Sequence, residues 1–340
     1  MSAFLSRRFD LRLWTLRRFH GAPDRDTIQG NARTQARAVH PRKRREDRMS
    51  DAEPRDTAEA GGWEPYPADG VEGSTVKGSV RVMRGVTGPR PDDRRDLLVY
   101  LPPSYDTGRR RYPVVYMHDG QNLFDRATSF SDEWEVDQTL DDASRHGLEC
   151  IVVGVPNLGD ARLDEYGPWP DHRHKAGGRA ADYVRWLTET VKPRVDADFR
   201  TRPGRECTGV AGSSMGGLVS LYAFFARSDV FGFAGVMSPA LWFGDGAALP
   251  WVAERPWVPG RLYLDVGTSE GTDELRDVRR LKDLLAAKGY AEGRDLLYVV
   301  EMGGQHNERA WARRLRREMH FLLGVPQPAP RREVRMTGAL

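Results

Sequence analysis

Short apolar runs alternate along this chain with longer segments in which apolar residues recur every three or four positions. The short runs, rich in Val, Leu and Tyr, predict buried strands, and the longer segments predict amphipathic helices. The predicted strands are 74–83, 95–101, 113–118, 149–155, 207–212, 233–237, 261–266 and 295–301. The predicted helices are 135–146, 180–196, 218–226, 272–288 and 309–323. Strands that alternate with helices favour an α/β class with a mainly parallel central sheet covered by helices on both faces.

Two long polar segments interrupt this alternation. Residues 156–178 are rich in Gly and Pro and contain aromatic residues, and residues 238–259 hold several tryptophans. Both segments follow predicted strands and are predicted to be loops. Because loops on a rigid scaffold carry most binding residues, we expect these two to shape any substrate site.

Residues 1–62 lack sustained periodicity and are the source of the basic charge of the chain. Residues 1–48 contain 13 Lys and Arg against 5 Asp and Glu, a net charge of +8. The remaining 39 Lys and Arg face 44 Asp and Glu in residues 49–340, a net charge of −5. A nucleic-acid partner inferred from the overall charge would rest on the leader alone, so we predict none.

Three interpretations of this leader stay open. Its composition buries too little apolar surface to offset chain entropy, which predicts disorder. An export or transit peptide is less favoured, because Arg and Asp interrupt the apolar residues near the N-terminus. The third interpretation is that translation begins at Met49, which opens an ordinary acidic start. We assign residues 1–62 to the leader, 63–324 to one α/β domain and 325–340 to a flexible tail.

The chain has two cysteines, Cys150 and Cys207, each beside or within a predicted strand. Two cysteines exclude a disulfide-stapled scaffold, and buried free thiols suit a reducing cytoplasm, which is the location we expect. No run of about 18 apolar residues occurs, so we predict no transmembrane helix and no membrane partner. The pattern leaves the oligomeric state open.

The strongest chemical signal lies between the strand 207–212 and the helix 218–226. The segment 212–217 reads Gly-Ser-Ser-Met-Gly-Gly and fits Gly-x-Ser-x-Gly with Ser214 at its centre. Glycines allow the backbone to turn sharply from strand to helix, and such a turn presents a nucleophilic serine. At the helix N-terminus, free N–H groups and the helix dipole favour a developing negative charge.

His306 is the candidate general base. It follows two glycines in the loop after the last predicted strand, and imidazole is the side chain that titrates nearest neutrality. The alternative is that His306 caps the next helix or is simply exposed. In an α/β hydrolase the triad follows the chain order serine, acid, histidine, and a candidate acid does lie between Ser214 and His306.

Glu270 is the expected acid, because it comes shortly after the end of the strand 261–266. Its carboxylate would accept from the imidazole, fix the tautomer and stabilise the imidazolium. Asp273 and Glu274 are rivals, although acidic residues are favoured in the first turn of any helix. Asp265 lies inside the predicted strand.

An oxyanion hole needs two backbone N–H groups aimed at the developing charge. One donor is expected at Met215, directly after the nucleophile, and we assign the second to Gln121 in the loop after the third predicted strand. Gly120 lets the backbone approach closely there. His118 and Asp119 in the same loop could be mistaken for a metal pair, and we interpret them as structural residues that orient the loop.

His172 and His174 have a weak metal-like spacing, but no cluster of further ligands supports it, so we predict no metal and no other cofactor. Trp134, Tyr166 and Trp169 lie in polar segments near predicted strand ends. They either pack the loops or line a pocket for an acyl or aromatic substrate, and both interpretations stay open.

Three segments together resemble the putative-esterase family of α/β hydrolases, which includes esterase D, enterochelin esterases, feruloyl esterases and mycolyl transferases. They are Tyr-Met-His-Asp-Gly-Gln-Asn-Leu-Phe-Asp at 116–125, Gly-Ser-Ser-Met-Gly-Gly at 212–217 and Ser-Pro-Ala-Leu-Trp at 238–242. The resemblance covers about 74–323 and implies an α/β-hydrolase fold and a serine esterase with Ser214 and His306 in its active site. It also implies that Arg162, Glu165 and Tyr166 belong to the loop that borders that site, and we expect Arg162 and Tyr166 to contact substrate.

The expected reaction is two-step acyl transfer from a small-molecule ester through a covalent serine intermediate, without a cofactor. Two other functions are possible on the same sequence. An acyltransferase would pass the acyl group to a sugar hydroxyl, although the missing signal peptide argues against a cell-wall role. A non-catalytic hydrolase-like binding module is expected to lack the nucleophile or the base, and both are present here.

Overall fold

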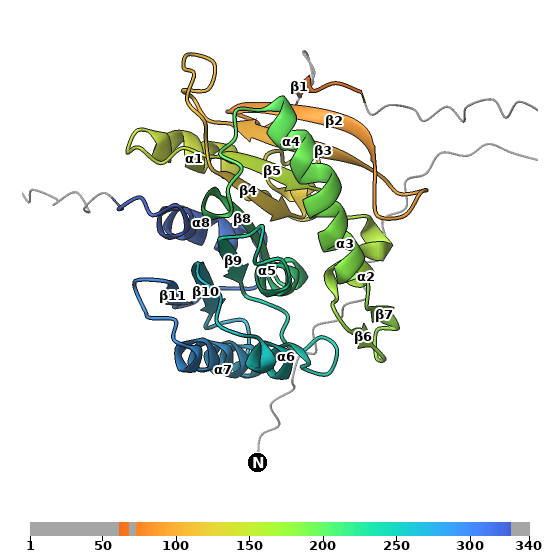
Figure 1. The fold of residues 1–340 in the computed structure, drawn as a ribbon, viewed down its shortest axis with the longest axis vertical. Helices are drawn as coiled ribbons and strands as arrows, with labels where there is room; N and C mark the ends of the chain where they lie inside the picture. The colour runs from red at the N-terminus through yellow and green to blue at the C-terminus, as the bar shows by residue number, and fades with distance from the viewer. Residues whose placement is uncertain (1–60, 68–72, 328–340) are drawn as a thin grey trace, which may run out of the picture. The chain divides into compact units, whose positions relative to one another are not determined.

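The computed structural model describes residues 61–67 and 73–327. Our expectations of a disordered or untranslated leader, and most of the expected C-terminal tail, concern residues 1–60 and 328–340 and lie outside that part of the chain. Within it, nine strands form one sheet in the order β1-β2-β3-β5-β4-β8-β9-β10-β11 (Figure 1). The strands are β1 (Glu64–Tyr66), β2 (Ser79–Thr87), β3 (Arg94–Leu101), β4 (Val114–His118), β5 (Ile151–Val155), β8 (Thr208–Ser213), β9 (Phe233–Met237), β10 (Arg261–Gly267) and β11 (Leu296–Glu301).

The sheet is mostly parallel, as predicted. Strands β5, β4, β8, β9, β10 and β11 pair in parallel, whereas β1, β2 and β3 pair antiparallel and extend one edge. The helices are α1 (Val136–Ser144), α2 (Arg162–Tyr166), α3 (Ala180–Trp186), α4 (Lys192–Asp198), α5 (Met215–Ala226), α6 (Ala248–Glu254), α7 (Thr272–Lys288) and α8 (Glu308–Leu323).

Helices cover both faces of the sheet, which explains why its parallel strands are continuously apolar. Along β4, Val114 and Tyr116 belong to the core that includes α3, α5 and α7, whereas Val115 and Met117 belong to the core under α1 and α8. Figure 1 shows α1 and α8 together on one side of the strands, with α3, α4 and α5 on the other. The strand ends that carry the candidate site therefore sit on a scaffold buried from two sides.

Several short elements depart from the sequence expectations. The predicted loop 156–178 contains a 3-10 turn (Gly159–Ala161), α2 and a two-stranded hairpin, β6 (Pro170–Asp171) and β7 (Ala176–Gly177). The predicted loop 238–259 contains α6. The predicted helix 180–196 is α3 and α4 joined by a π-helical turn, Leu187–Val191. Pro193 in α4 has no N–H to donate to a carbonyl in the preceding turn. The turn before it is π-helical instead of α-helical.

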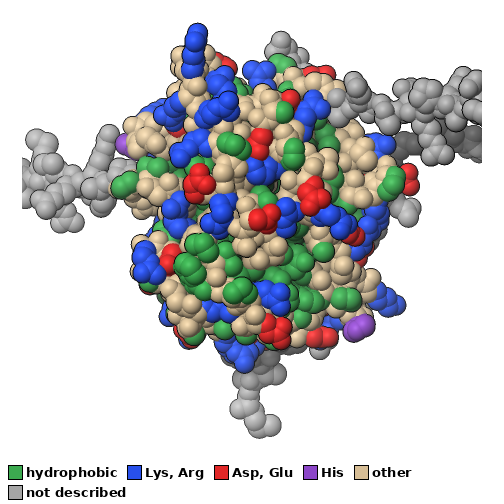
Figure 2. Space-filling view, viewed as in Figure 1, with side chains coloured by type: hydrophobic (Ala, Val, Ile, Leu, Met, Phe, Trp, Pro, Cys, Tyr) green, Lys and Arg blue, Asp and Glu red, His purple; other side chains and the backbone are tan. Residues whose placement is uncertain are grey.

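The exterior mixes charges of both signs. On the face seen in Figure 2, basic and acidic side chains are interspersed, and apolar side chains gather over its lower half. Cys150 and Cys207 are both free thiols in the buried interior. Among the described residues, no helix combines the length and the hydropathy needed to cross a membrane.

Candidate active site

Ser214 occupies the turn between β8 and α5 with a strained backbone. Its φ of 55° and ψ of −120° lie in a region that non-glycine residues rarely adopt, at a cost of about 1–3 kcal/mol. Neighbouring backbone groups hold this conformation, because the Ser214 N–H donates to Met237 O at 3.0 Å and the Ala240 N–H donates to Ser214 O at 3.0 Å. Gly217 allows the close approach of α5, since a Cβ there would lie 2.8 Å from Met237 O. This is the sharp strand-to-helix turn that the sequence predicts.

Glu270 and His306 meet at the same edge of the sheet. Glu270 follows β10, His306 follows β11, and the two strands pair in parallel. The Nδ1 atom of His306 lies 2.9 Å from Glu270 Oε2, and an ionised carboxylate can only accept, so Nδ1 carries the proton. The His306 side chain is 33% exposed and that of Glu270 is 1% exposed. This geometry leaves the second imidazole nitrogen for proton exchange.

Three further groups hold the other oxygen of Glu270. The Gly267 N–H and the Ser238 hydroxyl each donate to Oε1 at 2.7 Å, and Arg314 Nη2 lies 3.6 Å away. Burial alone would raise the pKa of Glu270, but the hydrogen bonds from His306, Ser238 and Gly267 together hold it below its ordinary value. Glu270 is therefore an anion at neutral pH.

The rival acids have other partners. Asp265 is fully buried, accepts from the Ser238 N–H at 3.0 Å and forms an ion pair with Arg314. Asp273 lies in the first turn of α7, where its exposed carboxylate pairs with Arg276.

The loop after β4 is fixed by a buried ion pair. Asp119 has a left-handed φ of 56°, and Arg162 donates to its two carboxylate oxygens at 2.8 Å each. Asn157 Nδ2 donates to Asp119 at 2.7 Å, and the Asp119 N–H donates to the Tyr166 hydroxyl at 3.1 Å. Burial opposes ionisation, but Arg162 and Asn157 outweigh it, so the pKa of Asp119 lies below its ordinary value.

His118 and the two candidate oxyanion donors complete this region. Burial lowers the pKa of His118 to about 3, and its Nδ1 lies 2.9 Å from the Tyr183 hydroxyl, so it is neutral at neutral pH. Gln121 belongs to a short 3-10 turn, Gly120–Asn122, directly after Asp119. Met215 is the first residue of α5, where a backbone N–H has no intrahelical acceptor. The two donor assignments stay predictions.

The candidate substrate residues are largely engaged within the protein. Trp134 is 3% exposed and packs on Trp311, and Tyr166 is fully buried. Arg162 binds Asp119, and half-buried Trp169 packs on aromatic residues of α5 and α6. These contacts favour the loop-packing interpretation in this conformation, and direct contact with substrate stays a prediction for each residue.

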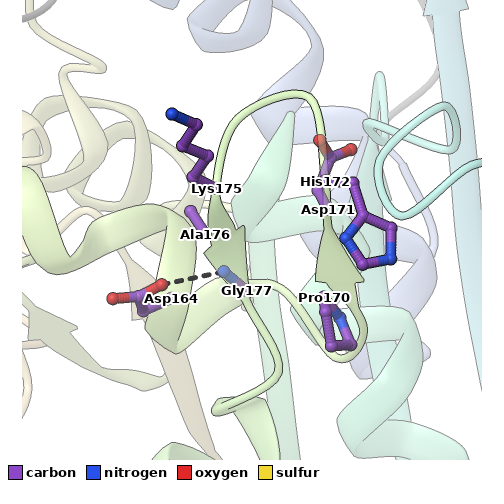
Figure 3. A pocket seen from close by; sticks show the side chains of 7 residues that line it. All are labelled: Asp164, Pro170, Asp171, His172, Lys175, Ala176 and Gly177. Carbon is purple, nitrogen blue, oxygen red and sulfur yellow. Dashed lines mark hydrogen bonds between the residues drawn. The ribbon is translucent and has the colours of Figure 1, made fainter.

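The pair His172 and His174 lies on the β6–β7 hairpin. His174 Nδ1 is 2.8 Å from Asp171 Oδ1, while His172 lines an open pocket of about 370 Å³ formed by the hairpin and Asp164. Figure 3 shows the residues that line this pocket, among which Asp164 accepts from the Gly177 N–H at 2.8 Å. Within the described ranges, no three His, Cys, Asp or Glu side chains converge closely enough to hold a metal ion.

Three residues around the candidate acid escape sequence reasoning: Ser238, Trp311 and Arg314. Trp311 Nε1 donates to Ser238 Oγ at 3.1 Å, and its ring stands edge-on to the His306 imidazole with centroids 5.0 Å apart. Arg314 Nη2 donates to the same Ser238 oxygen at 3.0 Å. Ser238 lies in one of the segments that carries the family resemblance, but nothing in the sequence pairs it with α8.

Comparison with known proteins supports an esterase relationship. A family model described as "Putative esterase" matches residues 88–322. An uncharacterized protein of Bacillus subtilis, YbbA, is 25% identical over 254 residues, which cover 71% of this chain and 98% of that protein. A siderophore enterobactin esterase of Emericella nidulans is 26% identical over 161 residues, 43% of this chain and 52% of that protein.

Solved structures share the fold. The enterobactin esterase FES of Shigella flexneri superposes with a TM-score of 0.59 at 19% identity, covering 74% of this chain and 60% of that one. The enterobactin hydrolase IroE gives a TM-score of 0.55 at 18% identity, covering 72% of this chain and 95% of that one. These similarities confirm the expected α/β-hydrolase architecture.

Proposed function

The chain belongs to the putative-esterase family, and on that premise we propose that it hydrolyses carboxylic esters through an acyl-enzyme on Ser214. The observation that carries the proposal is the hydrogen bond between His306 and Glu270 at the sheet edge where Ser214 also lies. Ser214, Glu270 and His306 follow β8, β10 and β11, and the carboxyl ends of parallel strands meet at one edge. Chain order and sheet geometry thus both support a serine–acid–histidine triad.

In the proposed mechanism, His306 takes the proton of the Ser214 hydroxyl as its oxygen attacks the ester carbonyl carbon. The backbone N–H groups of Met215 and Gln121 hold the oxyanion that forms. The tetrahedral intermediate then collapses, and the alcohol leaves with the proton that His306 returns. Water repeats the attack on the acyl-enzyme and releases the acid. Glu270 stays ionised and stabilises the imidazolium in both steps.

The relatives suggest which esters to test first. The chain is similar to a protein described as an endo-1,4-beta-xylanase/feruloyl esterase and to two siderophore esterases. Their names point to feruloyl esters and to siderophore esters. We therefore propose a small-molecule ester as substrate and a panel that contains a feruloyl ester, a catecholate ester of serine and simple p-nitrophenyl esters.

The test compares Ser214→Ala with Ser213→Ala, which removes the neighbouring hydroxyl at the end of β8. We expect Ser214→Ala to lower kcat for p-nitrophenyl butyrate by at least about 10³-fold, whereas Ser213→Ala retains most activity. A fluorophosphonate probe should label wild type and Ser213→Ala but not Ser214→Ala. Hydrolysis that survives in folded Ser214→Ala would exclude this nucleophile. Wild-type protein that binds esters of the panel without turning them over would favour a binding module.

A further inference from the structure

Arg314 is a buried cation that contacts two residues of the candidate site, Ser238 and Glu270. Its side chain is 4% exposed on the inner face of α8 and forms ion pairs with Asp265 at 2.9 Å and Glu301 at 3.0 Å. It also donates to Ser238 Oγ at 3.0 Å and lies 3.6 Å from the buried Oε1 of Glu270. The N–H groups of a guanidinium point in fixed directions, so Arg314 donates to Ser238 and Glu301 while its charge also faces Asp265 and Glu270.

The buried carboxylates around Arg314 require a positive charge at this position. Asp265 and Glu270 are both almost fully enclosed, with side chains 0% and 1% exposed. Burial raises the pKa of Asp265 to about 6, although Arg314 opposes that rise. Two neighbouring carboxylates in a buried site repel each other unless a cation lies between them. Arg314 supplies that cation beside Oε1 of Glu270, whereas His306 bonds to Oε2.

The hydrogen bonds of Ser238 define the direction of its hydroxyl. A serine hydroxyl has one hydrogen to donate and two lone pairs that accept. Ser238 Oγ accepts from Trp311 Nε1 and from Arg314 Nη2, and both are donors only. The single hydrogen is then left for the third neighbour, Glu270 Oε1, at 2.7 Å. The two N–H donors on α8 thus allow one orientation of the hydroxyl.

We propose that Arg314, with Trp311, orients the Ser238 hydroxyl toward Glu270 and so holds that carboxylate with its second oxygen facing His306. The inference rests on the proposed function and refines its triad. In this role Arg314 is a positioning residue, because it acts on the acid through Ser238 and touches no reacting atom. Helix α8 then holds the acid through Arg314 and borders the base through the ring of Trp311.

The test uses Ser238→Ala, which removes the hydroxyl without changing charge, and Arg314→Lys, which keeps the charge but loses the planar fork. Replacement of Arg314 by an apolar residue would remove the guanidinium from beside the buried carboxylates of Asp265 and Glu270 and would impair folding. Arg313→Lys is the matched control, because Arg313 is the neighbour on α8 and also pairs with Glu301, while its side chain is 53% exposed. Urea unfolding verifies that each variant is folded.

Two readouts separate positioning from a structural role. We expect Ser238→Ala and Arg314→Lys to lower kcat about 10- to 100-fold with little change in KM, since a small displacement of a catalytic group has effects of this size. The double variant should be no slower than the slower single variant, because both act in one chain of contacts. Arg313→Lys should retain the wild-type kcat.

The second readout is the downfield proton resonance of the His306 Nδ1–H bonded to Glu270, assigned by its loss in His306→Gln. We expect it to shift upfield or broaden in Ser238→Ala and Arg314→Lys and to stay in place in Arg313→Lys. Ester turnover in wild type with an unmoved resonance in both variants would overturn the positioning role alone. A resonance that responds as expected in a protein that hydrolyses no ester of the panel would overturn the proposed function alone.

Discussion

The ion pair between Asp119 and Arg162 should contribute more to stability than surface pairs do. The two side chains are 11% and 10% exposed, and two hydrogen bonds of 2.8 Å join them. Two unit charges about 4 Å apart interact by about 4 kcal/mol at an effective dielectric constant of about 20. Removal of one partner of a buried pair costs about 3–5 kcal/mol, because it leaves an uncompensated buried charge. Both energies predict that Arg162→Met lowers the free energy of unfolding by about 3–5 kcal/mol.

The assay is urea unfolding at pH 7, followed by tryptophan fluorescence and by circular dichroism, whose coincidence verifies a two-state transition. Asp119→Asn and the double variant Asp119→Asn/Arg162→Met complete a double-mutant cycle. Because the double variant removes both charges of this pair, we expect it to be more stable than Arg162→Met. A cost below about 1 kcal/mol for Arg162→Met, or strictly additive costs, would refute the reasoning.

The pH dependence of the same variants provides a check with a defined sign. The folded-state pKa of Asp119 is lowered, so its contribution to stability is present above its unfolded pKa of about 3.9 and is lost as pH falls through the folded value. In Arg162→Met the main cause of that lowering is removed. The difference in unfolding free energy between wild type and Arg162→Met should therefore shrink as pH falls below about 4. A difference that stays constant or grows toward pH 3 would contradict the assignment.

Two further substitutions test the buried core. Glu318 is fully buried, and neither of its carboxyl oxygens has a hydrogen-bond partner among the described residues. Burial raises its pKa well above the ordinary value, so the folded state is increasingly disfavoured as pH rises above about 4.3. Glu318→Met should raise the unfolding free energy at pH 7 by about 1–3 kcal/mol, and a lower urea midpoint would contradict this. Gly209→Ala should cost about 1–3 kcal/mol, because its Cβ would lie 1.9 Å from the Phe233 ring, whereas Gly62→Ala, which meets open space, should have little effect.

The long strands and helices could be predicted from the sequence because burial alone sets the order of their apolar and polar residues. Buried parallel strands require continuous apolar runs, and the predicted strand 233–237 and helix 272–288 agree with β9 and α7 residue for residue. Strand β1 and the hairpin β6–β7 could not be predicted, because two or three residues are too few to show a period. Their formation depends on partners that the chain supplies from elsewhere.

In the candidate site, too, residues that depend on distant partners could not be predicted from the sequence. Chain order and strand ends were enough to place Ser214, Glu270 and His306 on loops of one edge, although their roles stay predictions. Arg314 could not be distinguished, because the segment of α8 around it contains several arginines and most of them are exposed. A run of charged residues on a helix usually faces solvent, and the exception depends on tertiary packing against β10.

At the carboxyl ends of the parallel strands, buried ion pairs lie beneath exposed apolar side chains. Buried arginines contact two of the loops there, since Arg162 pairs with Asp119 after β4 and Arg314 lies beside Glu270, the candidate acid, after β10. Phe130, Trp242 and Met302, which are 49%, 37% and 82% exposed, lie on loops that follow β4, β9 and β11. A catalytic arrangement needs tight support from within, whereas substrate choice is set by the loops around it. Substitutions at these exposed positions should therefore change which ester is preferred more than they change the stability of the site beneath.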